Sequence, residues 1–126
     1  MAATVVNVAS RFEQVSEYWH PRIAAELNGQ HVKLAKLKGE FVWHSHAAED
    51  ELFFVARGTL TIRLRDRDLA IGPGEFVVIP RGVEHLPVAE EEVWVLLLEP
   101  ASTRNTGDVE NDRTVDAEWF EDLREQ

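Results

Sequence analysis

Between residues 30 and 100 the chain consists almost entirely of short apolar segments separated by turn signals, and this pattern restricts the possible folds more than any other feature. The segments are rich in valine, isoleucine, leucine and phenylalanine, which favour strands. Glycine, proline and charged residues lie between the segments, where turns are expected. We predict strands at 30–38, 41–46, 51–56, 59–65, 68–71, 76–79, 84–88 and 93–98, with turns at Asn28-Gly29, Arg57-Gly58, Asp66-Arg67, Gly72-Pro73-Gly74, Pro80-Arg81-Gly82 and Glu90-Glu91-Glu92. Many short strands at this spacing predict an all-β sandwich or small barrel.

An N-terminal arm, residues 1–29, is predicted to begin with a short helix. The sequence Ser10-Arg-Phe-Glu13 fits a capping box, in which Ser10 caps the helix and Glu13 reaches back to it. Phe12 and Val15 would form the buried face of this helix. It would end before Pro21, because the residue preceding a proline resists helical geometry.

A C-terminal tail, residues 101–126, differs from the strand region because it is polar and loop-like over its first half. Residues 116–123 are expected to form a short helix or turn. Trp119, Phe120 and Leu123 would share one helical face, and we expect them to dock on the barrel or on a partner.

The composition limits the partners of the chain. Its 126 residues are the usual size of one domain, and 13 basic against 23 acidic residues give a net charge of −10. Such a charge disfavours nucleic acid and anionic membrane surfaces as partners. The first residues lack the features of a signal peptide, and the longest apolar run, 93–98, is too short to span a bilayer. We therefore expect a cytoplasmic protein with no nucleic-acid or membrane partner.

The predicted strand at 51–56 is apolar on both of its faces, since Phe53 and Val55 alternate with Leu52 and Phe54. One face would line the barrel. The other face would need cover from the N-terminal segment or from a second copy of the chain. We therefore expect a homodimer.

His44 and His46 are the strongest chemical signal in the chain. Residues i and i+2 of a strand point to the same side, so these two imidazoles can converge on one point. His85, from another strand, and a carboxylate would complete a site for one divalent transition metal such as Fe, Mn, Ni, Cu, Co or Zn. With no cysteine in the chain, a metal must use histidine and carboxylate ligands. His20 and His31 lack convergent partners and are expected to be ordinary polar residues.

Three neighbouring acidic residues could supply the carboxylate. Glu51 is favoured because it shares a strand face with Phe53 and Val55. Glu49 and Asp50 are the alternatives, and both fall in the turn that precedes the strand.

The spacing around His44 and His46 resembles the first motif of the cupin superfamily. That motif reads Gly, five residues, His-x-His, three or four residues, Glu, six residues, Gly. The chain has Gly39, four residues, His44-x-His46, four residues, Glu51, six residues and Gly58. The first spacer is one residue short, a difference that shifts only a turn.

A second stretch is similar to the other cupin motif, which reads Gly, five residues, Pro-x-Gly, two residues, His, three residues, Asn. The chain has Gly74, five residues, Pro80-x-Gly82, two residues and His85, but Ala89 replaces the asparagine. That position lies outside the metal shell in the family.

The resemblance covers residues 30–100 and implies a double-stranded β-helix, or jelly roll, with residues 1–126 as a single cupin domain. It assigns the roles of metal ligands to His44, His46, Glu51 and His85. It does not assign a catalytic residue.

Three functions are compatible with such a barrel. The favoured one is a metal-dependent enzyme acting on a small polar molecule inside the barrel. A sugar-phosphate isomerase-like activity would need convergent cations, and the candidates, for which a solvated strand face is the favoured position, are Lys33, Lys36, Lys38, Arg63 and Arg65. A non-catalytic metal- or ligand-binding protein is the third. Four aromatic residues could line the cavity, although packing is the favoured role for most of them: Trp43, Phe53, Phe76 and Trp94.

Overall fold

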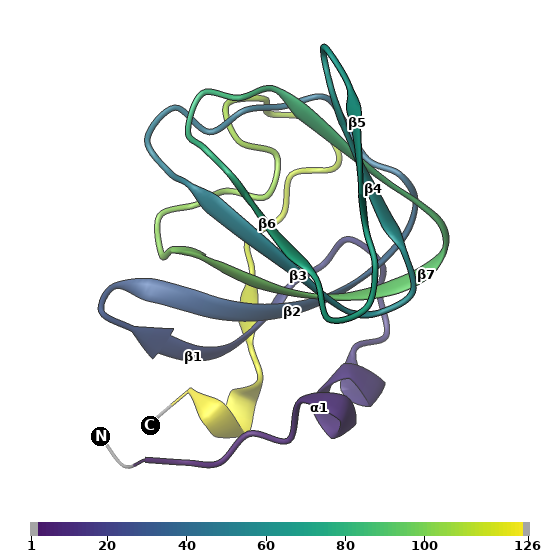
Figure 1. Cartoon of the computed structure of the whole chain (residues 1–126). Helices are drawn as coiled ribbons and strands as arrows, with labels where there is room; N and C mark the ends of the chain where they lie inside the picture. The colour runs from purple at the N-terminus through teal and green to yellow at the C-terminus, as the bar shows by residue number, and fades with distance from the viewer. Residues whose placement is uncertain (1–2, 125–126) are drawn as a thin grey trace.

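The longest strand, β7 (His85–Pro100), connects the parts of the fold in the computed structural model, which describes residues 3–124. It pairs antiparallel with β2 (Gln30–Glu40), β3 (Glu51–Arg57) and β4 (Leu60–Leu64). Next to these lie β1 (Arg22–Leu27) beside β2, β5 (Asp68–Ile71) beside β4, and β6 (Phe76–Ile79) beside β3. Figure 1 shows the strands wrapped around a common interior. The predicted all-β jelly-roll barrel is confirmed.

A wide bulge in β7 replaces the turn predicted at residues 90–92. Leu37 of β2 pairs with Val93, whereas Gly39 pairs with Ala89, so Glu90–Glu92 have no partner in the β2 ladder. The first half of β7 pairs with β4 and the second half with β3. The bulge thus lets one strand take part in both halves of the barrel. The prediction of separate strands at 84–88 and 93–98 is wrong, because β2 continues alongside both.

The strand predicted at 41–46 is also wrong. This segment is irregular, with a single bridge between His44 and His85. Its backbone is nevertheless held to the barrel, because Phe41 N–H donates to Pro87 O and Gly82 N–H donates to His46 O, at 3.0 and 2.8 Å. The two histidines therefore converge without a regular strand.

Side chains alternate between the barrel interior and the outer surface. Val93, Val95 and Leu97 of β7 are buried inside, together with Phe53 and Val55 of β3. The residues between them face outward and are partly exposed: Leu52, Phe54, Leu96 and Leu98. The inner face of β3 and β7 thus forms the core, whereas the apolar residues of the outer face are only partly buried.

The N-terminal helix α1 (Val8–Gln14) begins one turn earlier than predicted. Asn7 is the cap, since its Oδ1 accepts a hydrogen bond from Ser10 N–H at 3.0 Å. Ser10 therefore lies in the first turn and is not the cap. Phe12 and Val15 are buried as expected, and the helix ends at Gln14.

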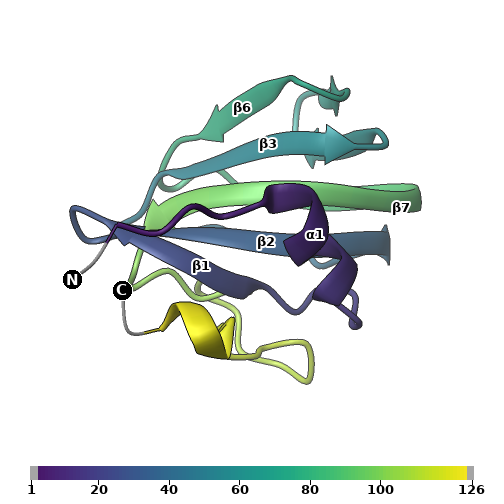
Figure 2. The ribbon, with the colours of Figure 1, turned by 90° about the horizontal axis from the view of Figure 1, so that it is seen from below.

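Both ends of the described chain cover the outer surface of β1, β2 and β7 (Figure 2). Phe12 stacks on Trp94 with ring centroids 5.0 Å apart, and Phe120 and Leu123 pack in the same cluster. The tail forms a two-residue strand, β8 (Glu118–Trp119), parallel to β1, and a 3-10 turn, η1 (Glu121–Leu123). Docking of the tail is confirmed, although the predicted single helical face is divided between these two elements.

The outer surface of β3 and β6 remains uncovered. Leu52 pairs with Val78 and Phe54 with Phe76, and the side chains of Phe76 and Val78 are 64% and 45% exposed. We call these four residues the β3–β6 outer face. Within residues 3–124, the structure contains no helix with the length and apolar character needed to cross a membrane.

Candidate metal centre

His44 and His85 are brought together by their backbones. His44 N–H donates to His85 O at 3.1 Å, and His85 N–H donates to His44 O at 2.9 Å. Each ring lies 2.8 or 2.9 Å from a carbonyl two residues earlier, with Nδ1 of His44 on Val42 O and Nδ1 of His85 on Val83 O. A carbonyl oxygen can only accept, so both Nδ1 atoms carry the proton. In both rings Nε2 is therefore the nitrogen with a free lone pair.

Glu51 and His46 complete the cluster. Oε1 of Glu51, the first residue of β3, lies 3.3 Å from Nε2 of His46 and 3.3 Å from Nε2 of His85. One ligand atom from each of four residues lies within 4.8 Å of the others: His44, His46, Glu51 and His85. The structure therefore gathers all four predicted residues at one point inside the barrel.

Burial determines the protonation state of His44. Its side chain is buried, and burial together with the nearby His85 lowers the pKa of His44 to about 4. His44 is therefore neutral at pH 7, the form of imidazole that binds a metal. Burial alone would raise the pKa of Glu51. Interactions of its carboxylate with the side chains of Glu99, His46 and His85 outweigh burial, and the pKa lies well below its usual value. Glu51 is thus an ionised carboxylate.

The donor atoms fit a divalent cation. Nε2 of His46, Nε2 of His85 and Oε1 of Glu51 are fully buried, and none of them has a hydrogen-bond partner in residues 3–124. Buried polar atoms without partners carry a large desolvation cost. A cation coordinated by neutral imidazoles and one carboxylate would satisfy all three atoms at once, and this ligand set suits first-row transition metals.

The alternative residues lie elsewhere and have other partners. Glu49 accepts a hydrogen bond from Ser102 Oγ at 2.9 Å, and Asp50 accepts from Arg81 N–H at 2.8 Å. His20 lies near Glu17 and Glu118, outside the cluster. His31 lies 3.3 Å from Glu26 and is also outside it.

Lys33 and Glu99 form a buried pair beside Glu51, which sequence reasoning missed. Lys33 Nζ donates to Glu99 Oε1 at 2.8 Å, and the two side chains are 4% and 3% exposed. Burial and the charge of Glu51 raise the pKa of Glu99 well above its usual value, so Glu99 keeps its proton and can donate it to Glu51. The expected solvated position is therefore wrong for Lys33.

Strand alternation could have revealed this pair. Lys33 has the same parity as the buried Ala35 and Leu37, and Glu99 follows Val95 and Leu97 at the same spacing. The pair was missed because charged residues that flank apolar runs usually lie at the surface.

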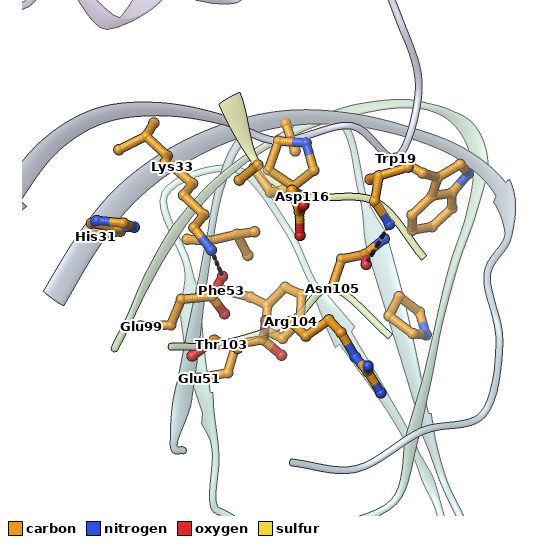
Figure 3. Close-up of a pocket in the computed structure, with 18 of the residues that line it drawn as sticks. Trp19, His31, Lys33, Glu51, Phe53, Glu99, Thr103, Arg104, Asn105 and Asp116 are labelled. Atoms are coloured by element: carbon orange, nitrogen blue, oxygen red, sulfur yellow. Dashed lines mark hydrogen bonds and ion pairs between the residues drawn. The ribbon is translucent and has the colours of Figure 1, made fainter. Parts of the chain in front are cut away.

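The cluster opens on a cavity of about 350 Å³. Figure 3 shows Lys33 and Glu99 on one side of it and Trp19 and Arg104 on the other. Trp19 and Phe41 form an aromatic wall, since their rings stack with centroids 4.7 Å apart, and Phe41 contacts the His44 ring edge-on. Sequence reasoning did not select either aromatic residue.

Of the four aromatic residues considered from the sequence, Phe53 is the one that lines this cavity. Trp94 packs in the outer cluster and Phe76 is on the surface. The Trp43 ring stacks under the Arg65 guanidinium at 3.7 Å. The cavity is therefore shaped by residues of the N-terminal arm and the 41–46 segment as well as by the barrel strands.

Comparison with known proteins identifies one family model and several solved structures that are similar to this chain. A family model for the cupin domain matches residues 30–99, a range that includes all four clustered residues. A cupin-2 domain containing protein from Shewanella frigidimarina NCIMB 400 superposes with a TM-score of 0.75 at 47% identity, over 76% of this chain and 94% of that one. Protein NMB1881 from Neisseria meningitidis gives a TM-score of 0.71 at 30% identity, over 77% and 99% of the two chains.

A curated relative, the uncharacterized protein YdbB of Bacillus subtilis (strain 168), is 39% identical over 62 residues. The match covers 48% of this chain and 55% of the relative, so the chain spans about half the length of that protein.

Proposed function

Because the chain belongs to the cupin family, we propose that it binds one divalent transition metal through His44, His46, Glu51 and His85 and acts as a metal-dependent enzyme on a small polar molecule in the barrel. The observation that carries the proposal is the convergence of these four buried side chains. Three of them have buried ligand atoms without a partner, and His44 and Glu51 line a cavity of about 350 Å³.

The residues of the chain have distinct tasks in this proposal. The carbonyls of Val42 and Val83 hold the protons of His44 and His85 on Nδ1 and so orient both Nε2 atoms. Protonated Glu99 helps to keep the Glu51 carboxylate ionised by lowering its pKa, and Lys33 donates a hydrogen bond to Glu99. A bound ion would supply Lewis-acid chemistry toward an oxygen of the ligand. The apolar barrel strands exclude water from one side of the cavity.

Two other functions are compatible with the same barrel. A sugar-phosphate isomerase-like activity finds less support, because Lys33 is engaged by Glu99 and the side chains of Lys38, Arg63 and Arg65 are exposed on the outside. A non-catalytic ligand-binding cupin would use the same cluster and cavity. Turnover of a bound ligand would separate the enzyme from the binding protein.

Metal analysis tests the central proposal. Protein purified without chelators is expected to contain about one divalent ion per chain, measured by elemental analysis, and metal-free protein is expected to be stabilised by adding that ion. His44→Ala should abolish binding. His20→Ala is the matched control, because His20 lies outside the cluster. No metal, together with no stabilisation by Mn, Fe, Co, Ni, Cu or Zn, would reject the proposal.

We also propose that two copies associate through the β3–β6 outer face. Support comes from the exposure of Phe76 and Val78, which form cross-strand pairs with Phe54 and Leu52 in a contiguous apolar surface. The N-terminal and C-terminal segments cover a different part of the barrel, so this face is open to a second copy.

A further inference from the structure

Residues 101–117 form a cap at the mouth of the cavity. Ala101–Asn105 and Val115–Ala117 all line the cavity, and they lie outside the range matched by the cupin family model. Figure 3 shows Thr103, Arg104, Asn105 and Asp116 of this cap among the residues that line the cavity, together with the Lys33–Glu99 pair and Trp19. The site therefore contains residues that the barrel alone does not supply.

The cap has an internal structure of its own. Asn105 Nδ2 donates to Arg113 O at 2.9 Å, and Val115 N–H donates to Asn105 Oδ1 at 3.0 Å. The hydroxyls of Thr106 and Thr114 are 2.6 Å apart, and Thr106 is fully buried. These contacts connect the two sides of the segment and fix its shape.

The cap also docks directly on the 41–46 segment, which carries His44 and His46. Asp108 N–H donates to Ser45 O at 3.0 Å. Gly107 has a φ of +59°, and a Cβ at this position would overlap Ser45 O and lie 3.3 Å from Cδ2 of the His44 ring. Only glycine permits so close an approach, so the position of the cap is coupled to the position of His44.

The cap contains two arginines. Arg113 lies over the Phe41 and Trp19 rings, with its guanidinium carbon 5.0 and 5.8 Å from the ring centroids. Arg104 is the one that lines the cavity, and its Nε donates to Gly107 O at 2.9 Å, which holds the guanidinium beside Gly107.

Within residues 3–124, neither terminal nitrogen of Arg104 has a hydrogen-bond acceptor or an ion-pair partner. Lys33, the other cation lining the cavity, is occupied by Glu99. Arg104 therefore offers the N–H groups of two terminal nitrogens, on a guanidinium held through its Nε.

We propose that Arg104 binds the carboxylate of a small acid whose apolar part lies against Trp19 and Phe41, an inference that rests on the proposed function because it names the ligand class of the same cavity. A guanidinium pairs with a carboxylate through two parallel hydrogen bonds. The exposed carboxylate of Asp116 at the cap favours a monoanion over a phosphate dianion, which it would repel more strongly.

Calorimetric titration of metal-loaded protein tests this inference. The probes are acetate and phenylacetate, each compared with its neutral amide, and phenyl phosphate. Phenylacetate is expected to bind at least tenfold more tightly than phenylacetamide and more tightly than phenyl phosphate. Arg104→Gln should remove this preference for the acid, and Arg104→Lys should restore part of it. Arg63→Gln, which changes an exposed arginine outside the cavity, should leave the preference unchanged.

Metal uptake is measured for every variant, so the two proposals fail separately. Normal metal uptake with no acid preference in the wild type, or with the same preference in Arg104→Gln, would overturn the role of Arg104. Tighter binding of phenyl phosphate would overturn the carboxylate assignment. An Arg104-dependent acid preference in protein that takes up no metal would reject the metal proposal and support the carboxylate site.

Discussion

At the scale of single residues, the candidate centre depends on which atoms are left without partners. The carbonyls of Val42 and Val83 occupy the Nδ1 atoms of two histidines, and burial keeps His44 neutral. Glu51 is distinguished from Glu49 and Asp50 in the same way, because its neighbours are imidazoles, whereas the others contact Ser102 and Arg81. Strand alternation predicted that Glu51 is the acidic residue that lies beside the histidines.

The depressed pKa of His44 predicts a pH dependence of stability in metal-free protein. In the folded state the pKa is about 4, below the usual 6.5, so the unfolded state binds the extra proton as the pH falls below 6.5. The free energy of unfolding contributed by His44 is therefore fully present above pH 6.5 and declines toward pH 4. Between pH 7.5 and 5 the loss should be about 2 kcal/mol, measured by urea unfolding after chelation. His44→Gln should reduce this slope, whereas an unchanged slope would contradict the assignment.

The proximity of the Glu51 and Glu99 carboxyl groups predicts different effects for two substitutions at position 99. Glutamine is neutral, like the protonated Glu99, and can donate to Glu51 while accepting from Lys33, so Glu99→Gln should change metal affinity by less than about threefold. Removing the contact should weaken metal affinity by about 10- to 100-fold. Calorimetry with the metal found in the purified protein provides the measurement.

The variant that removes this contact must also remove the charge of Lys33, since a buried unpaired ammonium would destabilise the fold. Lys33→Met combined with Glu99→Leu keeps the volume and removes both the ammonium group of Lys33 and the carboxyl group of Glu99. If this folded double variant binds metal as tightly as the wild type, Glu99 has no role in positioning Glu51.

At the scale of secondary-structure elements, the sequence predicted most strands but not how β7 passes between the two halves of the barrel. The Asn-Gly pair at positions 28 and 29 correctly predicted a hairpin turn, in which both residues have positive φ. Three consecutive glutamates look like a turn, and nothing local shows that β2 pairs on both sides of them. The bulge is determined by pairing between residues distant in sequence, which periodicity cannot detect.

Gly58 shows how this bulge is accommodated and supplies a prediction. Its φ is +84°, and an added Cβ would lie 2.7 Å from Glu92 O in the bulge. Gly74 has a similar φ of +82° but open space around it. Gly74→Ala should therefore cost about 1–2 kcal/mol through the backbone conformation alone, whereas Gly58→Ala should cost about 3 kcal/mol or more. Equal losses in urea unfolding would show that the bulge does not press on Gly58.

At the scale of the whole molecule, the two terminal segments cover the outer surface of β1, β2 and β7 and leave the β3–β6 outer face exposed. Phe12, Trp94 and Phe120 bury the surface of β1, β2 and β7, and Arg11 fastens the two ends by donating to both oxygens of Asp122 at 2.8 and 2.7 Å. The sequence indicated that the outer face of 51–56 needs cover. It could not show that the arm covers β7 and not β3, because that choice depends on packing angles.

The uncovered β3–β6 outer face predicts that substitution of Phe76 by lysine separates two copies of the chain. The wild type is expected to have about twice the 14.3 kDa chain mass by light scattering at micromolar concentration, because association would bury the exposed rings and methyl groups of this face. Phe76→Lys should give the mass of a single chain, since an ammonium at the centre of an apolar interface has no partner.

Leu27→Lys is the matched control, because Leu27 is 56% exposed on the β1–β2 hairpin, away from β3 and β6. Metal uptake should be the same in both variants, as neither residue contacts the cavity. A wild type that has the chain mass throughout this concentration range would contradict the dimer, and dissociation by Leu27→Lys alone would place the interface on the hairpin instead.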